Sequence, residues 1–202
     1  YKGSKMASKT VEYYNQNAQA FVDATLDVDL NELYDEFLPL IPKKGALLDA
    51  GCGSGRDAFI FKERGYSVDA FDISPAMAKL ASEYLNQDVA VSSFLELNDV
   101  AKYDGIWCCA SLIHVAKNDL TEAFNNLARA LKPQGIVYVS FKYGDGEREH
   151  NGREFTDLNE QALESIIKGT DLFILKSWQS ADQRPERATE TWLNAILHRR
   201  TI

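Results

Sequence analysis

A glycine-rich segment between residues 47 and 59, LLDAGCGSGRDAF, has the composition of a ligand-binding loop. A short apolar run includes Asp49, and glycines follow at alternating positions, Gly51, Gly53 and Gly55. Glycine lets a backbone turn tightly and approach a ligand without an intervening Cβ. A helix that starts after the loop would present unpaired N–H groups, which favour an anionic group. The segment therefore predicts a site for a carboxylate or a phosphate.

The glycine spacing and two acidic residues indicate which of these anionic groups the loop would bind. The glycine spacing is G-x-G-x-G, whereas a dinucleotide pyrophosphate site requires G-x-G-x-x-G. Asp49 would repel a phosphate but could hold an ammonium group, directly or through water. Asp72, at the end of the next apolar run, can accept hydrogen bonds from both hydroxyls of a ribose, although it could also only cap a helix. An amino acid joined to a nucleoside is S-adenosylmethionine, which we predict as the ligand.

Strands and helices that could position these residues alternate along the chain. Apolar runs with the length and composition of buried strands span residues 46–50, 67–72, 89–93, 105–109 and 135–142. Helical segments fit between them, and their predicted starts are Ser74-Pro75, Asp119 with Glu122, and Asp157 with Glu160. This alternation predicts a parallel sheet covered by helices on both faces.

The two ends of the chain differ from this pattern. Residues 11–37 have the spaced apolar positions of one or two amphipathic helices. Two strand-like runs, 171–179 and 190–199, predict a terminal antiparallel hairpin. We expect one domain, with Met6 as a candidate natural start, whose parts are a tag-derived or disordered start (1–9), a helical lid (10–40), a cofactor-binding core (45–142) and a C-terminal helix and hairpin (143–202).

Composition limits the partners. The net charge is −8, and no run of Lys and Arg is long enough to follow a phosphate backbone, which argues against nucleic acid as a partner. No apolar run could span a bilayer, and the N-terminus lacks an apolar signal core. The cysteines lack metal-ligand spacing. We predict a cytoplasmic monomer or homodimer with a small-molecule substrate and without a metal.

Four segments resemble the successive motifs of class I S-adenosylmethionine-dependent methyltransferases: LLDAGCGSGRDA, FDISPAMAKLA, YDGIWCCASLIHV and LARALKPQGIVYVSF. This resemblance runs from about residue 46 to 141, and the C-terminal segments resemble a small bacterial subgroup related to the tellurite-resistance type. It implies an α/β fold, a Rossmann-like three-layer sandwich with a mostly parallel seven-stranded sheet and an antiparallel C-terminal strand. The implied product is S-adenosylhomocysteine.

The resemblance also assigns cofactor-binding roles. Asp49 and the glycines would form the cofactor loop, Asp72 would hold the ribose, and Ile73 would be an apolar wall against the adenine. Relatives usually carry an acid after the third strand, which accepts from the adenine amino group. This chain has Ser93 and Phe94 there, so a neutral hydroxyl would have to accept.

Further side chains are candidates for contacts with the cofactor or the substrate. His114 follows the fourth strand and could take a proton from a hydroxyl, amine or thiol, or could only pack. Tyr14 and Tyr13 resemble lid residues at the cofactor and the substrate, although they could be plain core aromatics. Arg56 could bind the cofactor carboxylate or be solvated. A small anionic substrate would suit three arginines expected at the pocket mouth, which could also be surface residues: Arg153, Arg184 and Arg187.

Three functions follow from these residues. The first is methyl transfer to a small-molecule nucleophile, for which the protein must chiefly align the nucleophile and exclude water. The second is cofactor binding without catalysis, as a sensor or partner subunit. The third, a nicotinamide-dependent oxidoreductase, is disfavoured by the glycine spacing and by Asp49.

Overall fold

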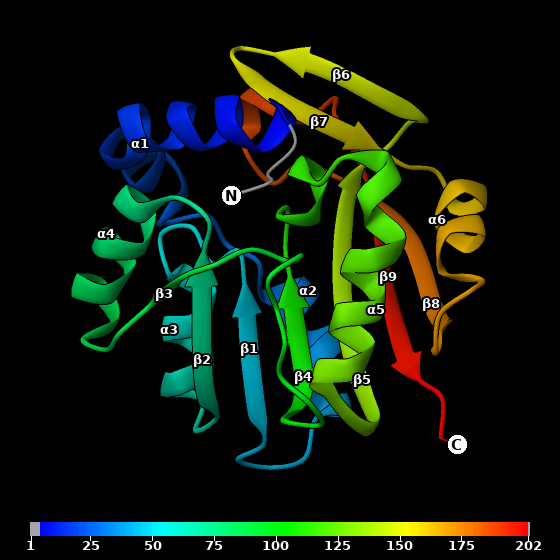
Figure 1. The fold of residues 1–202 in the computed structure, drawn as a ribbon. Coiled ribbons are helices and arrows are strands. Elements are labelled where there is room, and N and C mark those ends of the chain that lie inside the picture. Colours follow the sequence, from blue (N-terminus) through cyan, green and yellow to red (C-terminus); the bar gives the residue numbers. More distant parts are fainter. Residues whose placement is uncertain (1–4, 202) are drawn as a thin grey trace.

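One mixed sheet forms the centre of the molecule in a computed structural model that describes residues 5–201 (Figure 1). Its seven strands have the order β3-β2-β1-β4-β5-β9-β8, and only β9 is antiparallel to its neighbours. The strand bounds are β1 Ala46–Ala50, β2 Ser67–Asp72, β3 Ala90–Val91, β4 Tyr103–Cys108, β5 Leu131–Lys142, β8 Leu172–Ala181 and β9 Thr191–Arg199. The predicted fold class, including the antiparallel C-terminal strand, is confirmed.

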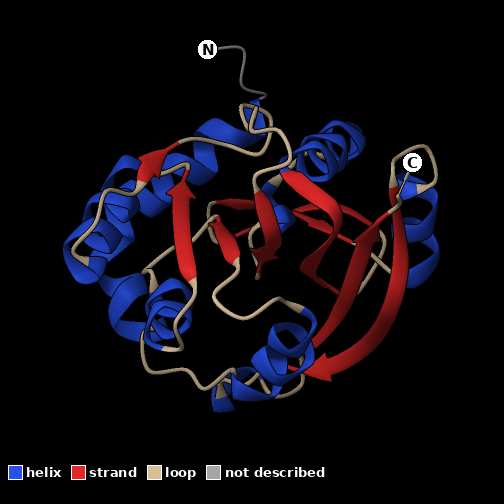
Figure 2. Cartoon of the chain, turned by 90° about the horizontal axis from the view of Figure 1, so that it is seen from below, coloured by secondary structure: helices blue, strands red, loops and turns tan. Residues whose placement is uncertain are grey.

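Helices cover both faces of this sheet (Figure 2). Alternate residues of β5 point to opposite faces, so that Ile136 and Tyr138 join one apolar cluster while Val137 and Val139 join the other. Helices α2, α3 and α4 pack into the first cluster, and α5 and α6 into the second. The helix bounds are α1 Lys5–Thr25, α2 Asn31–Phe37, α3 Arg56–Glu63, α4 Pro75–Leu85, α5 Leu120–Ala130 and α6 Glu160–Ile167.

The predicted strands agree best at the centre of the sheet. β1 and β2 have the predicted bounds, 46–50 and 67–72. The predicted strand 89–93 shortens to Ala90–Val91, because β3 is an exposed edge strand that pairs only with the last two residues of β2. β5 begins earlier than predicted, at Leu131, which pairs with β4 across an irregularity in the register.

The predicted helix starts differ in outcome. Ser74 caps α4 as predicted, with its hydroxyl accepting from the Met77 N–H at 3.2 Å. Asp119 occupies the N-cap position of α5, but its side chain makes no capping hydrogen bond. α6 is capped by Asn159, which accepts from Ala162 at 2.8 Å, and not by Asp157.

A hairpin that the sequence analysis missed explains this difference. β6 (Gly146–His150) and β7 (Arg153–Asp157) pair antiparallel through a two-residue turn. The turn residues, Asn151 and Gly152, both have positive φ, at 51° and 75°. An Asn-Gly pair with this backbone is the favoured tight turn of hairpins, so the sequence did carry the signal. Asp157 ends β7, and its carboxylate pairs with Arg148 at 2.5 Å.

Helix α1 and this hairpin lie beyond the carboxyl ends of the parallel strands (Figure 1). Asn15 of α1 accepts from the Ser74 hydroxyl at 2.6 Å, and Thr10 accepts from the Glu154 N–H at 3.1 Å. Two independent anchors therefore hold α1 over the sheet. In the second half of the predicted lid of residues 10–40, α2 packs against the sheet with Tyr34 fully buried.

The N-terminal end is helical earlier than expected. Residues 1–4 of the predicted tag-derived or disordered start lie outside the described residues, and α1 already begins at Lys5. Among the helices within residues 5–201, none is long and apolar enough to cross a membrane.

Candidate active site

Two cavities lie at the carboxyl ends of the parallel strands, beside α1. The larger has a volume of about 840 Å³, within the range of about 300–1,000 Å³ that is usual for ligand sites. The smaller has a volume of about 180 Å³. Their linings share five residues, Tyr14, Phe21, Gly51, Gly53 and Ala110. Ligands in the two cavities would therefore meet at this shared wall.

The glycine loop forms part of that wall. Gly51 and Gly53 have φ values of 72° and 55°, which side-chain-bearing residues rarely adopt. A Cβ on Gly51 would lie 2.5 Å from the Ser111 Cβ, so this position has no room for a side chain. Gly55 lines neither cavity and begins α3, where a Cβ would press on Leu85 of α4 at 3.2 Å. Gly55 therefore allows α3 and α4 to pack closely, and its cofactor contact stays a prediction.

Asp72 joins the loop to the end of β2. One carboxylate oxygen accepts from the Gly53 N–H at 2.9 Å, and the other accepts from the Ser74 N–H at 3.0 Å. Burial raises the pKa of Asp72, and these backbone hydrogen bonds oppose the shift. The side chain lines the larger cavity. Because each carboxylate oxygen can accept two hydrogen bonds, both oxygens retain capacity for a ligand.

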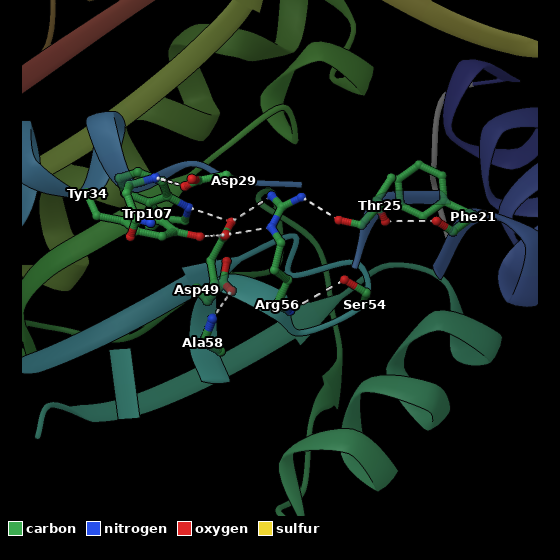
Figure 3. A network of polar contacts seen from close by, with 11 residues as sticks. Phe21, Thr25, Asp29, Tyr34, Asp49, Ser54, Arg56, Ala58 and Trp107 are labelled. Atoms are coloured by element: carbon green, nitrogen blue, oxygen red, sulfur yellow. Dashed lines mark hydrogen bonds and ion pairs between the residues drawn. The ribbon is translucent and has the colours of Figure 1, made fainter. Parts of the chain in front are cut away.

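Asp49 of β1 reaches the first turn of α3 (Figure 3). Its carboxylate is buried, lines neither cavity and accepts from the Ala58 N–H in the first turn of α3 at 3.1 Å. This contact holds the start of α3 against β1, and the ammonium contact of Asp49, directly or through water, stays a prediction. Burial and the nearby Asp57 raise the pKa of Asp49.

Arg56 differs from its prediction as well. Its guanidinium donates to both oxygens of Asp57, at 2.9 and 3.2 Å, and to the Thr25 carbonyl at 2.9 Å (Figure 3). Asp57 also accepts from the indole of Trp107 at 2.9 Å and from the hydroxyl of Tyr34. Arg56 lines the smaller cavity, but its charge is already paired. A bidentate contact with the cofactor carboxylate would require this network to break.

Predicted adenine contacts converge on the larger cavity. Ile73, Ser93 and Phe94 all line it. The Ser93 hydroxyl donates to the Glu96 carboxylate at 3.0 Å, which leaves its oxygen free to accept. Glu96 lines the same cavity and was missed, although an acid three residues after a loop serine is visible in the sequence.

His114 lies between Tyr14 and the hairpin. Its Nδ1 is 2.8 Å from the Glu154 carbonyl oxygen and must donate to it, so Nε2 accepts from the Tyr14 hydroxyl at 2.9 Å. Burial lowers the pKa of His114 to about 4. Both ring nitrogens are thus occupied in a neutral imidazole. In this geometry His114 holds Tyr14 in place, and its role as a general base stays a prediction.

Arg153, in β7, lines the smaller cavity with its side chain 7% exposed. Its guanidinium lies 4.7 Å from the ring centroid of Tyr13 and 5.2 Å from that of Phe155. One terminal nitrogen donates to the Tyr14 hydroxyl at 3.4 Å, and Nε has no hydrogen-bond partner among the described residues. Tyr13 itself lines neither cavity, so it supports a cation where a substrate contact was predicted.

Other cations surround the same cavity. Arg184 lines it but donates to both oxygens of Asp182, at 2.9 and 2.7 Å, so its charge is paired. Arg187 also lines it. Lys142, missed by the sequence analysis, is the last residue of β5 and forms an ion pair with Glu190 at 3.3 Å. Burial lowers the pKa of Lys142 despite this partner.

The central part of the chain is similar to known proteins. Residues 47–135 match the family model of the methyltransferase domain. YqeM of Bacillus subtilis is 32% identical over 117 residues, which cover 52% of this chain and 47% of YqeM. A malonyl-[acyl-carrier protein] O-methyltransferase of Serratia marcescens is 34% identical over 98 residues, covering 46% of this chain and 37% of that protein. The chain thus spans about half the length, or less, of these relatives.

A solved structure resembles nearly the whole chain. The 1,6-didemethyltoxoflavin-N1-methyltransferase of Burkholderia thailandensis, with bound 1,6-didemethyltoxoflavin and S-adenosylhomocysteine, aligns with a TM-score of 0.74 at 22% identity. The alignment covers 96% of this chain and 87% of that one. At this identity the likeness establishes the shared fold.

Proposed function

We propose that this chain, whose residues 47–135 form a methyltransferase domain of the class I S-adenosylmethionine-dependent type, methylates a small anionic molecule. The observation that carries the proposal is the wall shared by the two cavities. It consists of loop glycines on one side and of Tyr14 and Phe21 on the other. A donor in the larger cavity and an acceptor in the smaller one would be adjacent across it, which is the arrangement that a direct transfer requires.

The larger cavity fits the cofactor in size and in chemistry. Gly53 lines the cavity, and a Cβ there would be in ordinary contact with the Phe21 ring at 3.5 Å. Asp72 offers acceptors for ribose hydroxyls, and Ile73 and Phe94 offer apolar surface for a base. The sulfonium methyl that the cofactor supplies is electrophilic without further activation. The chain must therefore bind, align and exclude water, and α1 covers the site on one side.

The smaller cavity supports an anionic substrate. Arg153 and Lys142 lie there, and Arg153 lacks a carboxylate partner among residues 9–201. The relative from Serratia marcescens is named as an O-methyltransferase, so transfer to oxygen is one of the chemistries found among similar proteins. Membership of the small bacterial subgroup related to the tellurite-resistance type is also a proposal, and it depends on the C-terminal segments alone.

Cofactor binding without turnover is the competing function, because it would use the same larger cavity. Calorimetry should find binding of S-adenosylmethionine and none of NAD. A panel of small nucleophiles, both charged and neutral, should then be screened for release of S-adenosylhomocysteine. Binding without release in every case would favour the sensor or partner subunit, and absence of binding would contradict both functions.

A further inference from the structure

The arginines around the smaller cavity differ in whether a carboxylate pairs with them. Asp57 neutralises Arg56, and Asp182 neutralises Arg184, each through two hydrogen bonds. Arg153 has no such partner within residues 9–201, and residues 1–8 contain no Asp or Glu. A buried guanidinium without a counter-ion is costly, because burial removes the water that would otherwise solvate its charge. The cavity therefore lacks one anion.

Aromatic rings hold this cation in a fixed place. The Arg153 guanidinium lies over Tyr13 and Phe155, and Tyr14 accepts one of its hydrogen bonds. Such faces attract a cation electrostatically without supplying an acceptor for its remaining N–H groups. A planar carboxylate matches the planar donor fork of arginine better than a neutral group does.

The position of this cation is at the boundary between the two cavities. Arg153 lines only the smaller cavity. Tyr14, whose hydroxyl oxygen lies 3.4 Å from a terminal nitrogen of Arg153, lines both cavities. An anion held by Arg153 would thus face the larger cavity across the shared wall. The ammonium of Lys142 lies 4.9 Å from the Phe155 ring centroid and is paired with Glu190 at 3.3 Å, so Arg153 remains the main partner for such an anion.

The histidine at this site is not a free base. His114 lines the larger cavity but has both nitrogens engaged, one by Tyr14 and one by the Glu154 carbonyl. An acceptor that must lose its proton before transfer, such as an alcohol, would therefore not find a free imidazole in His114. A carboxylate is already ionised at neutral pH and requires none.

We propose that the methyl acceptor is a carboxylate oxygen of a small organic acid, held by Arg153 with Lys142 beside it. This inference rests on the proposed function. A lone pair of the carboxylate oxygen forms the new O–CH₃ bond while the S–CH₃ bond breaks, and its electron pair goes to sulfur. The sulfonium cation and the carboxylate anion become a neutral thioether and a neutral methyl ester, and no proton moves. The ester no longer pairs with Arg153, which favours its release.

The binding experiment compares matched acids and amides. In the presence of S-adenosylhomocysteine, calorimetry should be run with aliphatic and aromatic carboxylic acids, such as butyrate and benzoate, and with their carboxamides. At least one acid should bind about tenfold or more tightly than its amide, as expected for a charge-assisted pair, and Arg153→Gln should remove the difference. Arg148→Gln, on the same hairpin but paired with Asp157, is the matched control and should keep it. An equal affinity for acid and amide in every pair, or a preference that survives in Arg153→Gln, would overturn the inference.

The turnover experiment identifies the methylated atom. With a radiolabelled methyl group, the product of an acid substrate should release labelled methanol in alkali, because esters hydrolyse there whereas N-methyl, S-methyl and ether groups do not. If S-adenosylhomocysteine forms only with amines or thiols, and the label resists alkali, the carboxylate acceptor is wrong while the methyltransferase function stands. If the cofactor binds but no nucleophile in the panel releases S-adenosylhomocysteine, both the methyltransferase function and the carboxylate acceptor are contradicted.

Discussion

At the scale of single residues, Asp72 both lines a ligand cavity and holds the backbone of the adjoining loop. Its oxygens already hold the N–H groups of Gly53 and Ser74, so the same side chain shapes the loop and faces the larger cavity. Arg56 and Arg184 illustrate the opposite case, since their pairing with Asp57 and Asp182 turns candidate ligands into structural groups. Whether an ionisable residue remains available to a ligand thus depends on its pairing.

We expect Asp72→Ala to weaken S-adenosylmethionine binding by about tenfold or more, because hydrogen bonds to a carboxylate contribute roughly 1.5–3 kcal/mol each. Calorimetry measures the affinity, and circular dichroism checks that the fold persists. Asp69→Ala is the matched control, since Asp69 lies on the same strand but lines neither cavity. Parental affinity in Asp72→Ala would show that the ribose is not held there.

His114 should make stability depend on pH. Its pKa is lowered to about 4 in the folded chain, so between about pH 6.5 and 4 the unfolded chain binds the additional proton. Stability from this residue is present above that window and is lost as the pH falls through it, by about 2–3 kcal/mol.

Urea denaturation at several pH values measures this loss. His114→Gln, which has no titrating ring, should lose less stability over the same window than the parent. Equal slopes in the two proteins would mean that His114 titrates normally and is not confined between Tyr14 and Glu154.

At the scale of elements, prediction from sequence succeeded where one local pattern was sufficient. β1 and β2 are apolar runs bounded by glycines and turns, and their bounds were predicted correctly. β3 was overextended because its length depends on a neighbour that ends early. The β6–β7 hairpin was missed because its strands are polar, although the Asn-Gly turn was visible. The convergence of Arg153 with Tyr14, 139 residues away in sequence, has no local signal at all.

The hairpin turn should be sensitive to the loss of Gly152. Its φ of 75° costs a residue with a Cβ about 1–2 kcal/mol, while a Cβ there would be in ordinary contact with Tyr13 at 3.7 Å. Gly152→Ala should therefore lower the free energy of unfolding by that amount and weaken acid binding at Arg153 more than cofactor binding.

Urea denaturation and calorimetry test both effects. Gly169→Ala is the matched control, because this glycine has no positive φ and a Cβ there meets nothing within 4 Å. If Gly152→Ala is as stable as the control, the turn does not require its left-handed backbone.

At the scale of the whole molecule, the cofactor should stabilise the fold that it binds. A ligand at a concentration of 100 times its dissociation constant adds about 2.7 kcal/mol to the free energy of unfolding. The larger cavity is lined by α1, the end of β2, α4 and the segments after β1, β3 and β4, so local unfolding of any of these would release the ligand. We expect S-adenosylhomocysteine to raise the thermal midpoint of the entire chain in a single transition.

Gly53→Val separates the loss of this site from the loss of the fold. Valine at a φ of 55° should cost stability, and its side chain would enter the cavity wall, so the increment from S-adenosylhomocysteine should disappear. Gly65→Val carries a comparable backbone strain, at a φ of 95°, in the turn between α3 and β2, where a Cβ meets nothing within 4 Å. Without ligand, Gly65→Val should lose a similar amount of stability, yet S-adenosylhomocysteine should raise its thermal midpoint as much as that of the parent. Thermal melts of both variants with and without S-adenosylhomocysteine test this expectation. If the ligand still raises the thermal midpoint of Gly53→Val, it binds elsewhere. If it raises the midpoint of neither variant, backbone strain alone prevents binding.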